Sequence, residues 1–285
     1  MTKLQFFLPN QMADVGAFGG GSLGFAGMAG EGAPEKVDFS IRPRGRVLTG
    51  TYDEILSRLG DAKPAAAIVL FGNAGGENAF MQELNRRLSC PIVGGGAAMD
   101  GNRGRRIAGE GDACLFLLED DAFYIVTETK NIHSHILGRV KVGFDPVAPR
   151  VLLTIDGMDA KAWLDEKKAA LGFSGEDFEH LTLSDEMGIN AHFSFDGTNV
   201  LSGRDLEEEM IARYVLPEEV YPAVFDFYND TENVIVFGCA GLKGITGELT
   251  PVKSLGLYLF GEVCMTENGA EFGNLMLSKI RFVSK

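Results

Sequence analysis

The chain has 285 residues, of which 45% are hydrophobic and 23% are charged, values typical of a globular protein and not of a disordered one. Its 40 acidic and 26 basic residues give a net charge of −14, which disfavours binding to nucleic acid or to an anionic membrane surface. Glycine is about twice as frequent as average, at 37 residues, so the fold needs many tight turns or close backbone approaches.

The cysteines and the start of the chain predict a cytoplasmic protein. Cys90, Cys114, Cys239 and Cys264 form no C-x-x-C pair and are too few for a disulfide scaffold, so we expect reduced thiols. The first residues lack the long apolar core and the cleavage site of a secretory signal. The longest uncharged run near the start, residues 15–30, is shorter than the ~20 apolar residues of a transmembrane helix. We therefore expect no membrane span.

Residues 1–35 are predicted to form a glycine-rich arm or loop. Seven glycines lie between Val15 and Gly30, too many for a stable helix, and we expect a mobile loop or arm, either a disordered loop or one that closes over a ligand. The run also fits the dinucleotide fingerprint G-x-G-x-x-G and, around Ser22, the nucleophile pattern G-x-S-x-G. Neither pattern has the flanking strand and helix that its chemistry requires.

Residues 36–145 are predicted to be the first of two halves. Thr51 and Glu54 form a capping box that begins a helix, and Gly60 ends it. The expected elements, in order, are a helix over 51–60, a strand over 65–71, a helix capped by Asn78, a strand from Pro91, and strands over 113–118 and 123–129. The strand–helix–strand unit predicts parallel pairing in part of the sheet.

Residues 146–285 are predicted to be the second half. The expected elements are a strand over 151–155, a helix over 159–171, a hairpin over 192–201 with a type I′ turn at Asp196-Gly197, a helix or strand over 206–216, a helix opened by Pro217, and strands over 255–266 and 271–283. The last two flank Asn268-Gly269, a strong hairpin signal. The fold class is therefore mixed α/β, with parallel and antiparallel sheets and a C-terminal hairpin.

A short internal sequence repeat suggests that the two halves are related. The stretch that begins at Phe71 (FGNAG) returns at Phe237 (FGCAG), 166 residues later and again after an apolar strand. Gly95 and Gly261 differ by the same 166 residues. Chance recurrence in a glycine-rich chain explains this repeat equally well.

Several residue clusters are candidates for binding. The turn over 72–76 offers backbone N–H groups to an anion, and Arg103 belongs to a basic cluster after the glycines that follow Pro91. Glu262 follows Gly261 in an apolar strand, where a carboxylate needs either backbone donors or a cationic ligand. His133 and His135 have a spacing that suits a metal, although no third ligand lies near them in the sequence.

The C-terminal segment resembles a known family. A strand followed by Gly-Cys-Ala-Gly at 238–241, then Gly-Leu-Tyr-Leu-Phe-Gly-Glu at 256–262 and Phe-Gly-Asn at 272–274, resembles the C-terminal half of FIST domains. Residues 151–164 are similar to the strand, Asp-Gly turn and helix of that half, and 68–72 and 90–97 to parts of the N-terminal half. The resemblance covers about residues 65–283.

The resemblance implies a non-enzymatic sensory domain that binds a small molecule, with amino acids the usual proposal, and that signals to a separate output protein. The expected ligand-binding residues are Gly72, Asn73, Gly75, Gly76, Gly95, Arg103, Cys239, Tyr258, Gly261, Glu262 and Asn274. Glu262 is expected to bind the ligand's ammonium, and the 72–76 turn or the Arg103 cluster its carboxylate. Two alternatives stay open: a haem-based nitric oxide sensor with His133, His135 or His192 as axial ligand, and a hydrolase with Cys239 or Ser22 as nucleophile. No other cofactor is expected.

Overall fold

The fold is known from a computed structural model, which describes residues 13–18, 22–27, 45–71, 76–96, 113–119, 122–173, 179–229, 233–246, 255–259 and 261–285. It is a mixed α/β fold with parallel and antiparallel strand pairs, as the sequence predicts. The four cysteines are free thiols. Within the described residues, no helix has both the length and the apolar character needed to cross a membrane.

The first repeat is a four-stranded sheet with two helices. Its elements are β3 (Gly45–Gly50), α1 (Tyr52–Leu59), β4 (Ala66–Phe71), α2 (Glu77–Arg87), β5 (Ile92–Gly96) and β6 (Ala113–Leu118). The strands lie in the order β5-β4-β6-β3, with β4 and β5 parallel and the other pairs antiparallel. The capping box of Thr51 and Glu54 begins α1 as predicted, and Gly60 ends it.

The second repeat has the same strand order. Its elements are β7 (Phe123–Asn131), α5 (Pro217–Tyr228), β16 (Val234–Cys239), α6 (Ala240–Thr246), β17 (Leu255–Leu259) and β20 (Met276–Ser284). The order is β17-β16-β20-β7, again with one parallel pair, β16 and β17, and two antiparallel pairs. The two halves are therefore related in topology.

Strand register gives the correspondence between the repeats. Leu70, which precedes Phe71, pairs with Gly95, and Val236, which precedes Phe237, pairs with Gly256. The counterpart of Gly95 is thus Gly256. The predicted match of Gly95 with Gly261 is wrong because the second repeat has five fewer residues between its parallel strands.

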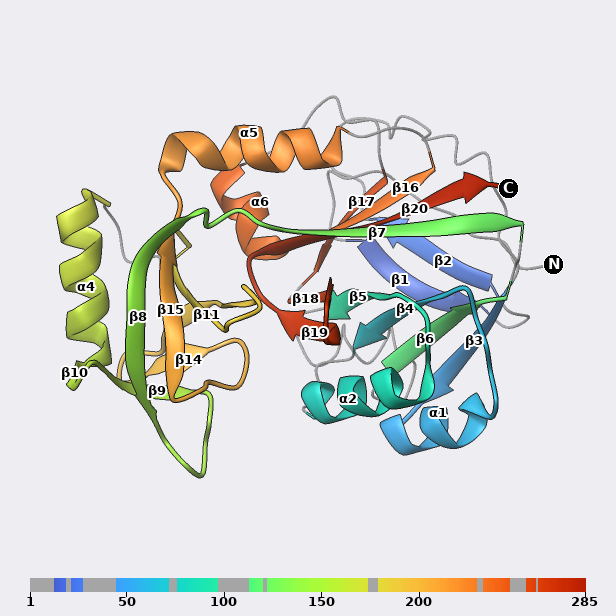
Figure 1. The fold of residues 1–285 in the computed structure, drawn as a ribbon, viewed down its shortest axis with the longest axis horizontal. Helices are drawn as coiled ribbons and strands as arrows, with labels where there is room; N and C mark the ends of the chain where they lie inside the picture. Colours follow the sequence, from blue (N-terminus) through green and yellow to red (C-terminus); the bar gives the residue numbers. More distant parts are fainter. Residues whose placement is uncertain are drawn as a thin grey trace.

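The two sheets pack face to face, with helices outside. Phe116 and Leu70 of the first sheet share one apolar core with Phe237 and Ile280 of the second. Helices α1 and α2 cover the far face of the first sheet, and α5 and α6 cover the far face of the second. The result is a four-layer α/β/β/α arrangement, with α1 and α2 at the bottom of Figure 1 and α5 at the top.

An inserted unit separates β7 from α5. It contains β8 (His135–Phe144), β9 (Val151–Ile155), β10 (Met158–Asp159), α4 (Ala160–Leu171), β11 (Leu181–Ser184), β12 (Asn190–Ala191), β13 (Phe193–Phe195), β14 (Val200–Ser202) and β15 (Glu209–Tyr214). The main strand order is β12-β11-β15-β8-β9-β14-β13, and Trp163 of α4 packs on this sheet. The unit is the lobe on the left of Figure 1. The predicted division at residue 145 does not follow these sheets, because β7 pairs with the C-terminal strand β20.

The C-terminal hairpin joins the two repeats. Strands β18 (Glu262–Thr266) and β19 (Gly269–Gly273) turn at Asn268-Gly269 as predicted, and β18 pairs with β5 of the first repeat. The two strands predicted for this hairpin, 255–266 and 271–283, are longer than β18 and β19. The chain changes direction at Gly261 (φ 85°) and at Leu275 (φ 53°), so β17 and β20 belong to the other sheet.

Three local predictions differ from the structure. Gly76, with φ 83°, is the N-cap of α2, and the Asn78 side chain instead donates to Asp205. The hairpin between β13 and β14 has a four-residue loop, not a two-residue turn, because the Asp196 carboxylate accepts the N–H groups of two following residues. The glycine-rich run contains a β-hairpin, β1 (Ala13–Phe18) and β2 (Ser22–Gly27), in place of an irregular loop. Segment 206–216, for which a helix and a strand were both open, contains the strand β15 (Glu209–Tyr214).

Candidate functional site

The candidate site lies where the repeats meet, at the carboxyl ends of their parallel strands. Strand β5 ends at Gly96, whose N–H donates to the carbonyl oxygen of Gly261 at 2.9 Å, in the turn after β17. Ligands of α/β folds commonly bind at the carboxyl ends of strands. Five of the predicted site residues come together here: Gly95, Cys239, Gly261, Glu262 and Asn274.

Two glycines allow the backbones to come this close. A Cβ on Gly95 would overlap the carbonyl oxygen of Gly261, and a Cβ on Gly261 would overlap the ring of Phe272. Gly261 also has a positive φ, which favours glycine. The sequence therefore needs glycine at both positions to bring β5 and β18 together.

Glu262 is the central polar group of the site. Its side chain is 0% exposed, and its Oε2 accepts the N–H of Met276 at 3.2 Å. Its Oε1 has no nitrogen or oxygen hydrogen-bond partner among the described residues. Burial raises the pKa of the Glu262 carboxyl well above its ordinary value, and the hydrogen bonds with the Met276 N–H and with the Cys239 side chain offset this only in part. The carboxyl group is thus stabilised in its neutral form.

Cys239 lies beside Glu262 at the end of β16. Burial, together with the nearby carboxyl of Glu262, raises the pKa of its thiol to about 12. A cysteine nucleophile reacts as the thiolate, which needs a lowered pKa. The environment of Cys239 therefore opposes the nucleophilic role that the hydrolase alternative requires, and the side chain of Ser22 lies outside the described part of the structure.

Asn274 connects the site to the inserted unit. Its backbone N–H donates to the carbonyl oxygen of Asn190 in β12 at 3.0 Å, and its side-chain amide lies against Gly203, after β14. Its Oδ1 is buried and has no hydrogen-bond partner in the described part of the chain. Buried polar atoms are nearly always paired, so Asn274 Oδ1, and Glu262 Oε1 once its carboxyl group is ionised, are two acceptors for a ligand.

The other predicted site residues are not placed with this cluster. Gly72, Asn73, Gly75 and Arg103 lie outside the described residues, and Tyr258 is in β17 with a side chain that is not described. Gly76 begins α2 and faces the ring of Tyr52. The structure adds Met276 and Gly203 to the site, two residues that no sequence pattern singled out. Met276 becomes a neighbour of Glu262, and Gly203 a neighbour of Asn274, only because segments that are not adjacent in the sequence come together in the fold.

Two of the histidines suggested as metal or haem ligands, His133 and His135, have other partners. The ring nitrogens of His133 contact the carbonyl oxygen of Glu179 at 2.7 Å and the Asn190 side chain at 3.1 Å. Burial lowers the pKa of His133 to about 4, so the ring is neutral near pH 7. His135 pairs with Glu219 at 2.8 Å. Among the described residues, no group of three or more His, Cys, Asp or Glu side chains is arranged to hold a metal ion.

No family model matches the chain, and no curated protein matches it. The resemblance to FIST domains therefore stays a prediction from the residues quoted above.

Proposed function

We propose that this protein is a sensory domain that binds a small molecule carrying an ammonium group, such as an amino acid, at Glu262. The observation that carries the proposal is a fully buried carboxyl group at the junction of the two repeats, whose Oε1 has no nitrogen or oxygen hydrogen-bond partner among the described residues. The sequence resemblance to FIST domains points to the same class of protein.

The chemistry of binding follows from the two unpaired acceptors. A ligand ammonium donates to Glu262 Oε1 and to Asn274 Oδ1. A positive charge close to a carboxyl group favours the ionised form, so Glu262 loses its proton when the ligand binds. The buried charge is then paired and hydrogen-bonded, which offsets the cost of its burial.

Burial also couples binding to a change of shape. Because Glu262 is 0% exposed, a ligand reaches it only when a covering segment moves. The turn at Leu275 has a positive φ, which is a strained conformation for a leucine, and its neighbour Asn274 contacts the inserted unit. A rearrangement of this turn would carry the binding event to the inserted unit, and from there to a separate output protein.

Thermal unfolding with a panel of the twenty amino acids tests the proposal. A ligand that binds only the folded state raises its stability by about 2.7 kcal/mol at 100 times its Kd. We expect Glu262→Gln to remove most of that stabilisation. Glu267→Gln, an exposed change in the turn of the same hairpin, should keep it. If Glu262→Gln keeps the full ligand-induced shift, the ammonium site is not at Glu262.

A further inference from the structure

A cavity follows the outer edge of strand β19. It has a volume of about 450 Å³ and lies between α2, segment 204–207 of the inserted unit, and the β18–β19 hairpin. Ala270 and Phe272 line it, and so does Glu271 between them, although successive side chains of a strand point to opposite faces. A cavity that is lined from both faces lies along the edge of the strand. In the described part of the chain, β19 is the last strand of its sheet.

The register of the hairpin shows which backbone groups point to this edge. Residues of an antiparallel pair alternately bond to the neighbouring strand and point away from it. The N–H of Ala270 donates to Asn85 Oδ1 at 2.9 Å, and its carbonyl oxygen accepts from Asn85 Nδ2 at 2.8 Å, so Ala270 points away from β18. The N–H of Asn274 also points away and donates to the carbonyl oxygen of Asn190. Phe272 lies midway between Ala270 and Asn274, so its N–H and carbonyl oxygen point to the same edge.

Phe272 is an open position between two occupied ones. Among the described residues, nothing outside the β18–β19 ladder bonds to its N–H or to its carbonyl oxygen. Backbone groups of a residue that is only 5% exposed are nearly always paired. The occupied positions on either side are each about 7 Å away along the strand, so the opening has room for one residue of an added strand. The Asn85 carboxamide shows that a planar amide fits against this edge.

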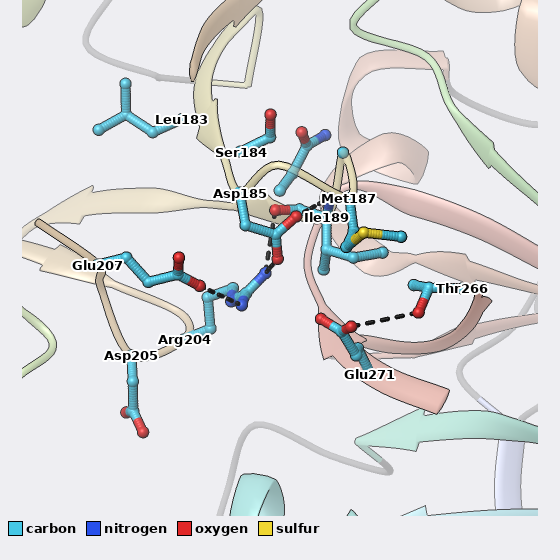
Figure 2. A network of polar contacts seen from close by, with 12 residues as sticks. Leu183, Ser184, Asp185, Met187, Ile189, Arg204, Asp205, Glu207, Thr266 and Glu271 are labelled. Carbon is cyan, nitrogen blue, oxygen red and sulfur yellow. Dashed lines mark hydrogen bonds and ion pairs between the residues drawn. The ribbon is translucent and has the colours of Figure 1, made fainter. Parts of the chain in front are cut away.

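The charge of the lining selects among peptides. The charged side chains of the described lining residues are Arg204, Asp205, Glu207 and Glu271, three acids to one base. Figure 2 shows Glu271 on its strand and Arg204 and Glu207 on the facing segment of the inserted unit. Asp185 pairs with Arg204 at 2.7 Å, so the one basic group of the lining is already neutralised. The cavity therefore disfavours an acidic peptide.

We propose that this edge binds one residue of an extended peptide, neutral or basic, by strand addition to β19. The N–H of that residue donates to the carbonyl oxygen of Phe272, and its carbonyl oxygen accepts the N–H of Phe272, as in an antiparallel pair. Met81 and Leu206 line the same cavity and contact the carbon chain of the peptide's side chain. Glu262 does not line this cavity, and the site does not depend on the function proposed above.

The probe for this site is N-acetyl-L-lysine N-methylamide, a single lysine residue between two peptide groups. Titration followed by NMR should detect binding in the millimolar range, as the few atoms of the probe allow, and should move the amide signal of Phe272. The same compound with a methyl group on the lysine backbone nitrogen cannot donate to Phe272 and should bind about tenfold more weakly. N-acetyl-L-glutamate N-methylamide should also bind more weakly. Absence of binding by the lysine probe, or equal binding of its N-methylated form, would overturn the proposal.

Hydrogen exchange tests the open position directly. In the free protein the N–H of Phe272 should exchange faster than that of Glu271, because Glu271 is bonded to Cys264 of β18. A saturating concentration of the lysine probe should slow the exchange at Phe272. Equal protection of both amides in the free protein would overturn the proposal, since the Phe272 N–H would then already have a partner.

Two tryptophan variants of α2 locate the probe. Gln82 is exposed and lines the cavity, so Gln82→Trp places a large side chain in it and should weaken binding of the lysine probe by about tenfold or more. Ala79→Trp is the matched control, because Ala79 is exposed on the same helix and does not line the cavity. It should bind the probe as the parent does. Unchanged affinity in Gln82→Trp would overturn the proposal.

Discussion

The N–H of Gly96 and the carbonyl oxygen of Gly261 form a 2.9 Å hydrogen bond that joins the end of β5 to the turn between β17 and β18. Through this bond the C-terminal hairpin of the second repeat becomes part of the sheet of the first. The two repeats are thus held together by backbone pairing as well as by the core between their sheets.

Gly95→Ala tests the close approach at this junction. The new Cβ would overlap the carbonyl oxygen of Gly261, which is backbone and cannot rotate away. We expect the free energy of unfolding in urea to fall by about 1–3 kcal/mol more than in Gly138→Ala. Gly138 is a matched control, since its φ of 152° is close to the 156° of Gly95 but its Cβ would have nothing within 4 Å. If both variants lose the same free energy of unfolding, glycine is needed at position 95 only for its backbone conformation.

Phe237→Ala tests the core between the two sheets. Phe237 is 0% exposed and packs with side chains of both repeats, so its loss leaves a cavity that a sheet cannot close. We expect a loss of about 3–5 kcal/mol in the free energy of unfolding. Phe195→Ala, at a side chain that is 42% exposed, should cost about 1 kcal/mol or less. A small loss at Phe237 would contradict the four-layer packing.

His133 should titrate far below an ordinary histidine. Its folded pKa is about 4, so its stabilising effect is complete at pH values above the unfolded pKa of about 6.5. That contribution is lost as the pH falls through the range between these values, by about 1.4 kcal/mol per pH unit. NMR of the imidazole protons should show His133 unprotonated at pH 5.5. A midpoint near 6.5 would show that the ring is not buried as described.

The pH dependence of stability that Glu262 causes should have the opposite sign to that of His133. Its folded pKa is raised, so its contribution to stability is complete below the unfolded pKa of about 4.3 and is lost as the pH rises toward the folded value. His133 contributes equally to the parent and to Glu262→Gln, so the difference between the two proteins reports on Glu262 over the range between its unfolded and folded pKa values. We expect the parent protein to lose up to about 1.4 kcal/mol per pH unit there, and Glu262→Gln to lose less. Equal slopes would mean that Glu262 is ionised in the folded protein.

Local sequence signals predicted the individual elements well. The caps of α1, with Thr51 and Gly60, depend only on residues close in sequence. The parallel pairing of β4 with β5 follows in the same way from one strand–helix–strand unit. Of the site, the carboxyl of Glu262 stood out because a charged group in an apolar strand needs a partner.

Long-range pairing could not be predicted from these signals. Strand β15 pairs with β8, although more than sixty residues separate them, so the inserted unit has no local boundary at residue 145. The ion pair of Arg204 with Asp185 likewise joins two loops of that unit, and neither residue stands out in its own segment. Both features depend on how the strands associate and not on periodicity or caps.

The most direct test of the Glu262 site is proton release on binding of the amino acid that gives the largest thermal shift. Titration calorimetry in two buffers of different ionisation enthalpy, at a pH where the parent carboxyl is neutral, measures the protons released per ligand. The account predicts a release approaching one proton per ligand for the parent protein. For Glu262→Gln it predicts no release and a Kd about tenfold to a hundredfold higher, as for the loss of a charged hydrogen bond. Binding of equal affinity in both proteins, without proton release in either, would contradict the claim that Glu262 receives the ligand's ammonium group.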